Sequence, residues 1–189
     1  ITGSINTRDF KTMRDGMPVL AVIDIDSVTI VSYTGYEGTN NSNAIYNQFY
    51  PANTIPNNAF HYYSSNTGKT SLTSIILPYS ITAIGQGAFD GVTSLTSRKI
   101  PSSVNLIGES AFWPFWGKIN VQSENAYFSS IDGILFNKSK TLLIQCPVSR
   151  AGEYTIPATV QTIGYRAFSL TDLTSVTIPS TVKSIKSYA

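Results

Sequence analysis

Apolar residues recur along most of the chain in one fixed order. The segment from Leu72 to Leu95 reads LxxIxLPxxIxxIGxxAFxxVxxL, and the phrase begins again at Leu95, at Tyr154 and at Leu173. The prolines of the four copies, Pro78, Pro101, Pro157 and Pro179, stand 23, 56 and 22 residues apart. Recurrence at about one coil's length is typical of a solenoid, in which each repeat packs only against its neighbours. We therefore expect one continuous, mainly β solenoid of coils of 22 to 23 residues, with short helical turns.

Each copy predicts a short strand that ends at its proline. In the first copy the apolar side chains Leu72, Ile75 and Leu77 face the core. Side chains alternate along a strand, so Ile76 faces outward. Pro78 lacks the N–H that a strand ladder needs, and it ends the strand.

A second apolar set turns the chain back into the core and forms the opposite wall: Ile81, Ile84, Val104 and Ile107. The corner that follows carries a glycine in three copies: Gly85, Gly108 and Gly164. Either a positive φ or a close approach of two backbones favours glycine there. The Ala-Phe pair, as in Ala88 and Phe89, then closes the coil through one short helical turn and buries its ring.

Four hydroxyl residues stand two positions after the prolines: Ser80, Ser103, Thr159 and Thr181. Such side chains can bond to neighbouring backbone groups, and they predict a ladder of hydrogen bonds along the stack. The alternative is that they are ordinary turn residues.

The pattern is broken at several places. The 56-residue interval holds an altered coil at about residues 119–147. Arg98 stands where the pattern has an apolar residue, Lys186 replaces a corner glycine, and IPNNAF at 55–60 lacks the second apolar set. The last copy stops at Ala189, one residue before the expected phenylalanine, so we expect the parent chain to continue.

The amino-terminal residues 1–32 predict a cap made of a helix and a first strand. Asn6 or Thr7 can begin the helix, and Gly16-Met17-Pro18 can end it. The strand that follows carries apolar side chains at Leu20, Ile23 and Ile25. Residues 33–54 form an insert rich in Tyr and Asn, and the repeats occupy residues 55–189.

The segments IPSSV, IGESAF, TIPATVQTIGYRAF and VTIPSTVKSI together resemble the BspA-like class of leucine-rich repeats found on bacterial surfaces. The resemblance covers 55–189, and the block 125–147 resembles a variant coil of such arrays. It implies a leucine-rich-repeat solenoid with an amino-terminal helical cap. It also implies an exported protein that offers a binding surface, in some members for host matrix proteins or other cells.

Composition agrees with an extracellular location. Charged residues make up 13% of the chain, against roughly 25% in typical soluble domains. The net charge of +2 comes from scattered residues, so nucleic acid is not an expected partner. Cys146 is the only cysteine, which excludes an intrachain disulfide and favours a buried apolar role. No apolar run approaches the ~20 residues of a membrane span. Because the sequence starts at Ile1 without methionine, we expect a processed or trimmed product.

The outward strand positions are the first candidate binding surface, for a protein or host-surface ligand: Ile76, Lys99, Asn120, Thr155 and Thr177. The second candidate is FWPFWG at 112–117, where Phe115 takes the core position of Val92. Trp113 and Trp116 then lie near the surface, either as a stacking site for a sugar ring or as cover for the enlarged turn. Arg98 is expected to stack on one of these indoles and so to leave the apolar interior.

The insert is the third candidate. Tyr36 and Tyr46 lie in a long loop whose Tyr and Asn content suits adaptable binding, although the loop can equally shield the first coil. Asp24 and Asp26 project from the first strand, and two solvated carboxylates are favoured there over a calcium site, which needs six to eight oxygens.

The residues do not indicate an enzyme or a cofactor. His61 is the single histidine and is expected in a turn, no carboxylates are set to face each other, and no nucleotide or metal motif is present. Three hypotheses remain: a non-catalytic module that binds a protein or host surface, a carbohydrate-binding module that uses the tryptophans, and a structural spacer.

Overall fold

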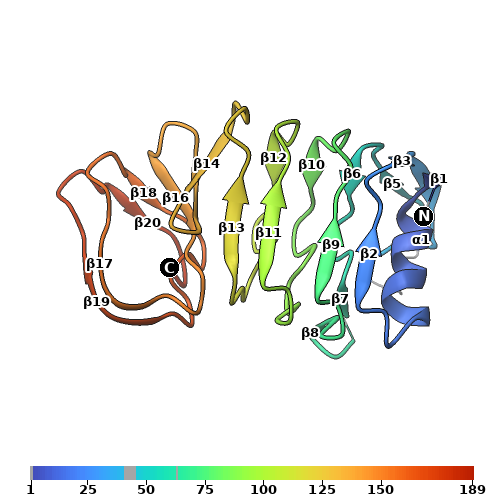
Figure 1. The fold of residues 1–189 in the computed structure, drawn as a ribbon, viewed down its shortest axis with the longest axis horizontal. Coiled ribbons are helices and arrows are strands. Elements are labelled where there is room, and N and C mark those ends of the chain that lie inside the picture. Colours follow the sequence, from blue (N-terminus) through green and yellow to red (C-terminus); the bar gives the residue numbers. More distant parts are fainter. Residues whose placement is uncertain (1, 41–45, 63) are drawn as a thin grey trace.

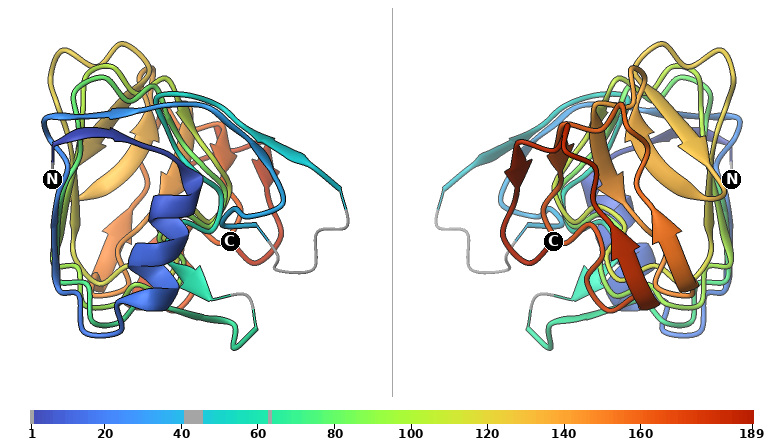
Figure 2. Two further views of the ribbon diagram at one scale, coloured as in Figure 1. Left: turned by 90° about the vertical axis from the view of Figure 1, so that its right-hand side faces the viewer. Right: turned by 90° about the vertical axis from the view of Figure 1, so that its left-hand side faces the viewer.

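The chain folds into a stack of coils that follow one another along one axis. The computed structural model describes residues 2–40, 46–62 and 64–189. Figure 1 shows the coils side by side from the amino-terminal cap to the carboxy-terminal end, and Figure 2 shows that they overlie one another when viewed along the stack. Strands are the main regular elements of the described part, joined by turns and with one short helical segment near the amino terminus, so the predicted solenoid is confirmed.

A helix covers the amino-terminal end of the stack, as predicted. The elements of the cap are β1 (Gly3–Ile5), α1 (Thr7–Lys11), a π-helical segment (Thr12–Gly16) and β3 (Val28–Ile30), which pairs in parallel with β1. Asn6 begins α1, and its side chain and that of Asp9 form a reciprocal capping box. Phe10 and Met13 are buried, so the helix turns its apolar side to the first coil.

One strand of each coil builds the first wall. These strands are β2 (Val22–Asp24), β9 (Ser74–Ile76), β11 (Ser97–Ile100), β13 (Lys118–Val121), β17 (Ala151–Thr155) and β19 (Asp172–Thr177). They pair in parallel as β2 with β9, β11 with β13, and β17 with β19. Ile75 packs against the core whereas Ile76 is exposed, which confirms the predicted alternation.

Shorter strands build the second wall: β6 (Thr54–Ile55), β10 (Ala83–Ile84), β12 (Leu106–Ile107), β16 (Leu142–Gln145), β18 (Thr162–Ile163) and β20 (Ser184–Ile185). They form two parallel groups, β6–β10–β12 and β16–β18–β20. Ile55 pairs with Ile84, so the expectation that IPNNAF lacks the second apolar set is wrong. Its isoleucine belongs to this wall, and Pro56 stands at the corner.

The altered coil contains an antiparallel meander. Two further strands, β14 (Phe128–Ile131) and β15 (Ile134–Asn137), lead from β13 to β16, and consecutive strands from β14 to β16 run antiparallel. The side chain of Asn125 is buried and donates to the backbone carbonyls of Pro101 at 2.8 Å and Val104 at 2.9 Å. These bonds fasten the altered coil to the regular coil before it.

Two small hairpins lie outside the repeat: β4 (Tyr33–Gly35) with β5 (Gln48–Tyr50), and β7 (His61–Tyr62) with β8 (Thr67–Gly68). The buried Arg14 donates to the carbonyls of Thr39, Asn58 and His61 at 2.9, 2.8 and 3.0 Å. One guanidinium therefore ties the helix, the insert and the first coil together. His61 begins β7, so its expected place in a turn is corrected.

Aromatic rings run through the core along the stack. The rings of Phe10, Phe60, Phe89 and Phe112 follow one another with centroids 6.0, 5.4 and 5.8 Å apart. Beyond the meander a second apolar cluster contains Cys146, whose thiol is buried as predicted. Burial raises the pKa of Cys146 to about 12, so the thiol stays protonated at neutral pH.

The corner glycines are required by the close approach of neighbouring backbones. A Cβ on Gly108 would lie 2.7 Å from the Cα of Gln86, and one on Gly164 would lie 2.8 Å from the carbonyl oxygen of Leu143. The positive φ falls two residues later, directly before each alanine, with values from 53° to 59° at Asn58, Gly87, Ser110, Arg166 and Tyr188. Of the two reasons for glycine, close approach therefore applies at the corner itself.

The Ala-Phe pair closes each coil through turns, and the predicted helical turn is wrong. The backbone N of Ala88 donates to the carbonyl of Gly85, whereas that of Phe89 donates to Ala111 in the next coil at 2.8 Å. A helix would keep both bonds within its own coil. The left-handed residue before alanine redirects alternate amides along the stack, because it breaks the helical path.

The predicted hydroxyl ladder is also wrong. Ser103 Oγ and Thr181 Oγ1 are buried and have no hydrogen-bond partner in the described part of the chain. The backbone closes the turn instead: the N of Val104 donates to the carbonyl of Pro101 at 3.3 Å, and the equivalent bond recurs in the other copies. These hydroxyl residues are turn residues, as the alternative held.

Arg98 lies inside the core. Its guanidinium carbon is 4.1 Å from the ring centroid of Phe115 and 5.0 and 5.3 Å from those of Phe89 and Phe112. The expectation that it stacks on an indole and leaves the interior is wrong, because the inward strand position directs its side chain among these rings. Nη2 donates to the carbonyl of Val92 at 3.3 Å, whereas Nε and Nη1 have no hydrogen-bond partner among the described residues. Burial lowers the pKa of Arg98 to about 9, so the group is still a cation at neutral pH.

We expect Arg98→Met to raise the free energy of unfolding by about 1–3 kcal/mol in urea denaturation. The ring contacts stabilise the cation by about 2 kcal/mol, but removing an ion from water costs several kcal/mol and each unpaired donor about 1–3 more. Arg98→Ala is the control, because it removes the packing of the side chain together with its charge. If the methionine variant unfolds at a lower urea concentration than the parent, the buried charge is not a net cost and the prediction is wrong.

Gly108→Ala should lower the free energy of unfolding by about 2–3 kcal/mol, because its Cβ meets the backbone of the preceding coil. Gly16→Ala is the matched control, since its nearest neighbour would be Thr12 Cγ2 at 3.7 Å. Thermal unfolding followed by circular dichroism compares the two. Equal melting temperatures would show that the coils can separate at this corner at little cost.

Candidate functional site

The outward positions of the first wall form an exposed surface, which we call the strand face. The predicted residues lie on five strands: Ile76 on β9, Lys99 on β11, Asn120 on β13, Thr155 on β17 and Thr177 on β19. All five are exposed, and Ile76 keeps 49% of its accessible surface. The register sets Lys99 beside Asn120 and Thr155 beside Thr177, in two separate sheets.

A shallow cavity of about 150 Å³ lies on the strand face between β9 and β11. Ile76 and Lys99 line it, together with Tyr79 and Asp26. Tyr79 is exposed as well, so apolar surface meets one carboxylate and one ammonium group here. The structure therefore gathers two of the predicted residues around a hollow that the sequence did not indicate.

The two tryptophans have different environments. Trp113 is partly buried, and the guanidinium carbon of Arg166 lies 4.1 Å from its ring centroid. Its Nε1 is buried and has no hydrogen-bond partner in the residues that the structure describes. Trp116 is 49% exposed, and its carbonyl accepts from the hydroxyl of Ser149. Phe115 is fully buried, as predicted. Because Arg166 stacks on Trp113, Trp116 offers the more open ring of the two.

The described part of the insert is held against the first coil. Thr39 is buried, and its hydroxyl donates to the carbonyl of Asn57 at 2.6 Å. Tyr36 and Tyr46 are 59% and 74% exposed, and residues 41–45 between them lie outside the described part. Binding through these two tyrosines stays a prediction.

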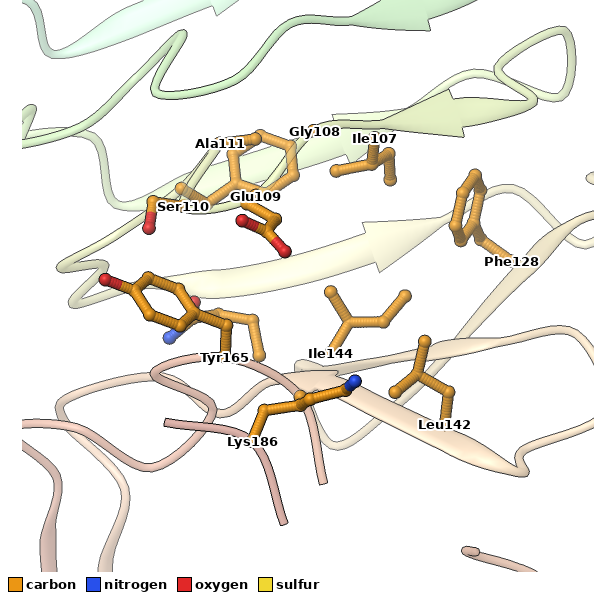
Figure 3. A pocket seen from close by; sticks show the side chains of 13 residues that line it. Ile107, Gly108, Glu109, Ser110, Ala111, Phe128, Leu142, Ile144, Tyr165 and Lys186 are labelled. Atoms are coloured by element: carbon orange, nitrogen blue, oxygen red, sulfur yellow. The ribbon is translucent and has the colours of Figure 1, made fainter. Parts of the chain in front are cut away.

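A cavity of about 240 Å³ opens in the second wall between β12 and β16, and the sequence analysis missed it. Figure 3 shows Ile107, Phe128, Leu142 and Ile144 around one end and Glu109 and Tyr165 at the other, with Lys186 along one side. The sequence feature that could have indicated this cavity is Ile144. It follows Leu143 at the position where the regular copies carry a corner glycine.

A polar trough of about 470 Å³ adjoins this cavity and shares Glu109, Ser110 and Tyr165 with it. Asp90 and His61 also line the trough, and Asp90 Oδ1 lies 3.8 Å from His61 Nδ1. Burial raises the pKa of the Asp90 carboxyl, and His61 opposes that rise. This is a carboxylate held partly out of water, at the edge of an open hollow.

The described residues contain no cluster of three His, Cys, Asp or Glu side chains that could hold a metal ion. Asp24 Oδ1 accepts from the backbone N of Asp26 at 3.1 Å. In the same part of the chain no helix is long and apolar enough to cross a membrane.

Comparison with solved structures finds the same architecture in bacterial proteins. The pneumococcal vaccine antigen PcpA is 23% identical with a TM-score of 0.61, over 72% of this chain and 35% of that one. A leucine-rich cell surface protein of Faecalibacterium prausnitzii is 22% identical with a TM-score of 0.56, over 96% and 44%. A leucine-rich repeat protein of Eubacterium ventriosum is 20% identical with a TM-score of 0.48, over 97% and 55%.

The chain thus spans between about a third and just over half of these proteins. At such identities the likeness shows the fold alone. A search of curated proteins found no match. The model of the BspA-type leucine-rich repeat region matches residues 53–189 with 6 copies. The chain therefore belongs to the BspA-type leucine-rich repeat family.

Proposed function

We propose that the chain is a non-catalytic, extracellular module that binds a protein ligand of a host or cell surface through its strand face. The observation that carries this proposal is the hollow between β9 and β11, where exposed Ile76 and Tyr79 stand between Asp26 and Lys99. Protein interfaces combine such apolar anchors with a charged rim. The descriptions of PcpA as a vaccine antigen and of the F. prausnitzii protein as a cell surface protein support the location.

The remaining strand-face residues extend the same surface. Asn120 lies beside Lys99, and its amide donates to Ser97 Oγ at 3.2 Å. Thr155 and Thr177 offer hydroxyl groups on the sheet beyond the meander. The backbone under these positions is held by parallel pairing, so a ligand meets side chains whose spacing is fixed before binding. We assign the anchor to β9 and β11 and the polar contacts to the other strands.

The carbohydrate alternative rests on Trp116, because the guanidinium of Arg166 stacks on Trp113. A single exposed indole offers one stacking site rather than a platform of two rings. We therefore favour the protein ligand and keep the glycan as a competing outcome, together with the spacer.

A panel of purified extracellular-matrix proteins, measured by biolayer interferometry, tests the proposal. We expect the double variant Ile76→Asp/Lys99→Glu to weaken the binding of any matrix ligand by about 10- to 30-fold, because the loss of a central anchor costs about 2 kcal/mol. Its melting temperature should not change, since both side chains are exposed.

Lys183→Glu repeats the charge reversal of Lys99→Glu at a distant position and is the control for it, because Lys183 is exposed and precedes β20 on the second wall. Unchanged binding by the double variant would refute the strand-face assignment. Trp116→Ala with loss of signal on a glycan array would favour the carbohydrate alternative, and no binding to any matrix protein would favour the spacer.

A further inference from the structure

The second wall is interrupted where β12 and β16 face each other. In the described part of the chain β12 is an edge strand that pairs only with β10, while β16 pairs with β18 and β15. The other neighbouring strands of this wall pair at two residues each. An edge strand keeps backbone donors and acceptors that can pair with another extended chain.

Ile144 stands at the interruption, in the place of a corner glycine. The backbone N of Gly164 donates to the carbonyl of Leu143, as that of Gly108 donates to Ile84, so Ile144 occupies a corner position. Both edges of β16 are paired, one with β15 and the other with β18, so β16 leaves no edge for β12. A hollow that Ile107 and Ile144 help to line remains between β12 and β16.

The hollow has the size and lining of a receptor for one side chain. Ile107, Phe128, Leu142 and Ile144 surround its apolar end in Figure 3. Its volume of about 240 Å³ lies below the roughly 300–1,000 Å³ of pockets that enclose a whole small ligand. A large apolar side chain of another molecule fits this volume better than a separate compound does.

The adjoining trough favours a cation. Asp90 and Glu109 both line it, and no Lys or Arg side chain of the described residues forms a salt bridge with either carboxylate. The guanidinium of Arg166, which also lines the trough, lies over three aromatic rings: Trp113, Tyr165 and Tyr188. A basic side chain that enters the trough would therefore meet Glu109 at the end where the trough joins the hollow, whereas Asp90 already has His61 Nδ1 at 3.8 Å and the charge of Arg166 acting on it.

We propose that the cleft between β12 and β16 binds an extended peptide segment of a partner protein, with a large apolar side chain in the hollow and a basic side chain in the acidic trough. The open edge of β12 supplies backbone pairing, as in other complexes that add a strand to a sheet. Side chains two residues apart point to the same side of an extended chain, so the segment carries the sequence Lys-x-Phe or a close equivalent. This site lies on the wall opposite the strand face and does not depend on the function proposed for that face.

The test uses acetylated and amidated eight-residue peptides that contain Lys-x-Phe, with Glu-x-Phe and Lys-x-Ala versions for comparison, in fluorescence polarisation against the whole chain. We expect both replacements to weaken binding by tenfold or more. Glu109→Lys should weaken Lys-x-Phe binding by a similar factor, and Leu142→Trp should abolish it by filling the hollow. Glu109 is exposed, so its variant remains informative if Leu142→Trp fails to fold.

Lys99→Glu on the strand face is the control and should leave peptide binding unchanged, which separates this site from the strand face. The proposal is overturned if no Lys-x-Phe peptide binds, or if folded Glu109→Lys binds as the parent does. Binding of fatty acids or saccharides in the cleft without any binding of the peptides would overturn it as well.

Discussion

The close approach of neighbouring backbones at the corner row governs the geometry of this molecule. At Gly108 the preceding coil lies so near that no Cβ fits, and the amide of Gly108 bonds to the carbonyl of Ile84. Short strands of two residues could not hold a wall by themselves, but their repetition along the stack gives every coil a neighbour on each side. The phenylalanine rings inside the stack follow the same spacing.

Where this constraint is relaxed, the surface changes. Ile144 replaces a glycine at the corner, and a cavity separates β12 from β16. Pro56 stands at the corner of the first coil, and the neighbour of this coil on the amino-terminal side is the cap. The regular coils supply the support, and the cavity of the second wall lies where the meander and Ile144 interrupt their repetition. Binding surfaces of different character can coexist on one stack for this reason.

The repeat predicted the walls, the alternation at Ile76 and the burial of Phe115, because each depends on contacts within one coil or between similar coils. The residue types at the start of the helix left two candidates for its cap, Asn6 and Thr7, and the structure has Asn6. Other features depended on which of several groups makes a given contact, and a sequence does not show this. The backbone closes the turn at Ser103, so its hydroxyl bonds to nothing among the described residues. Arg98 remains inside because its guanidinium makes cation–π contacts with three phenylalanine rings. The cavity beside Ile144 was missed because the meander hides the register of that coil.

The two walls are chemically suited to different partners. The strand face carries outward side chains on three pairs of parallel strands, and its candidate contacts are made by these side chains. Among the described residues, the cleft in the second wall has the open edge of β12, a hollow and the carboxylate of Glu109, so a ligand there can also pair with the backbone. Backbone pairing selects for extended conformation, whereas side-chain contact selects for surface shape. A chain that presents both surfaces can hold a folded partner on one side and an extended segment on the other, because the stacked core between them is rigid and keeps the two sites apart.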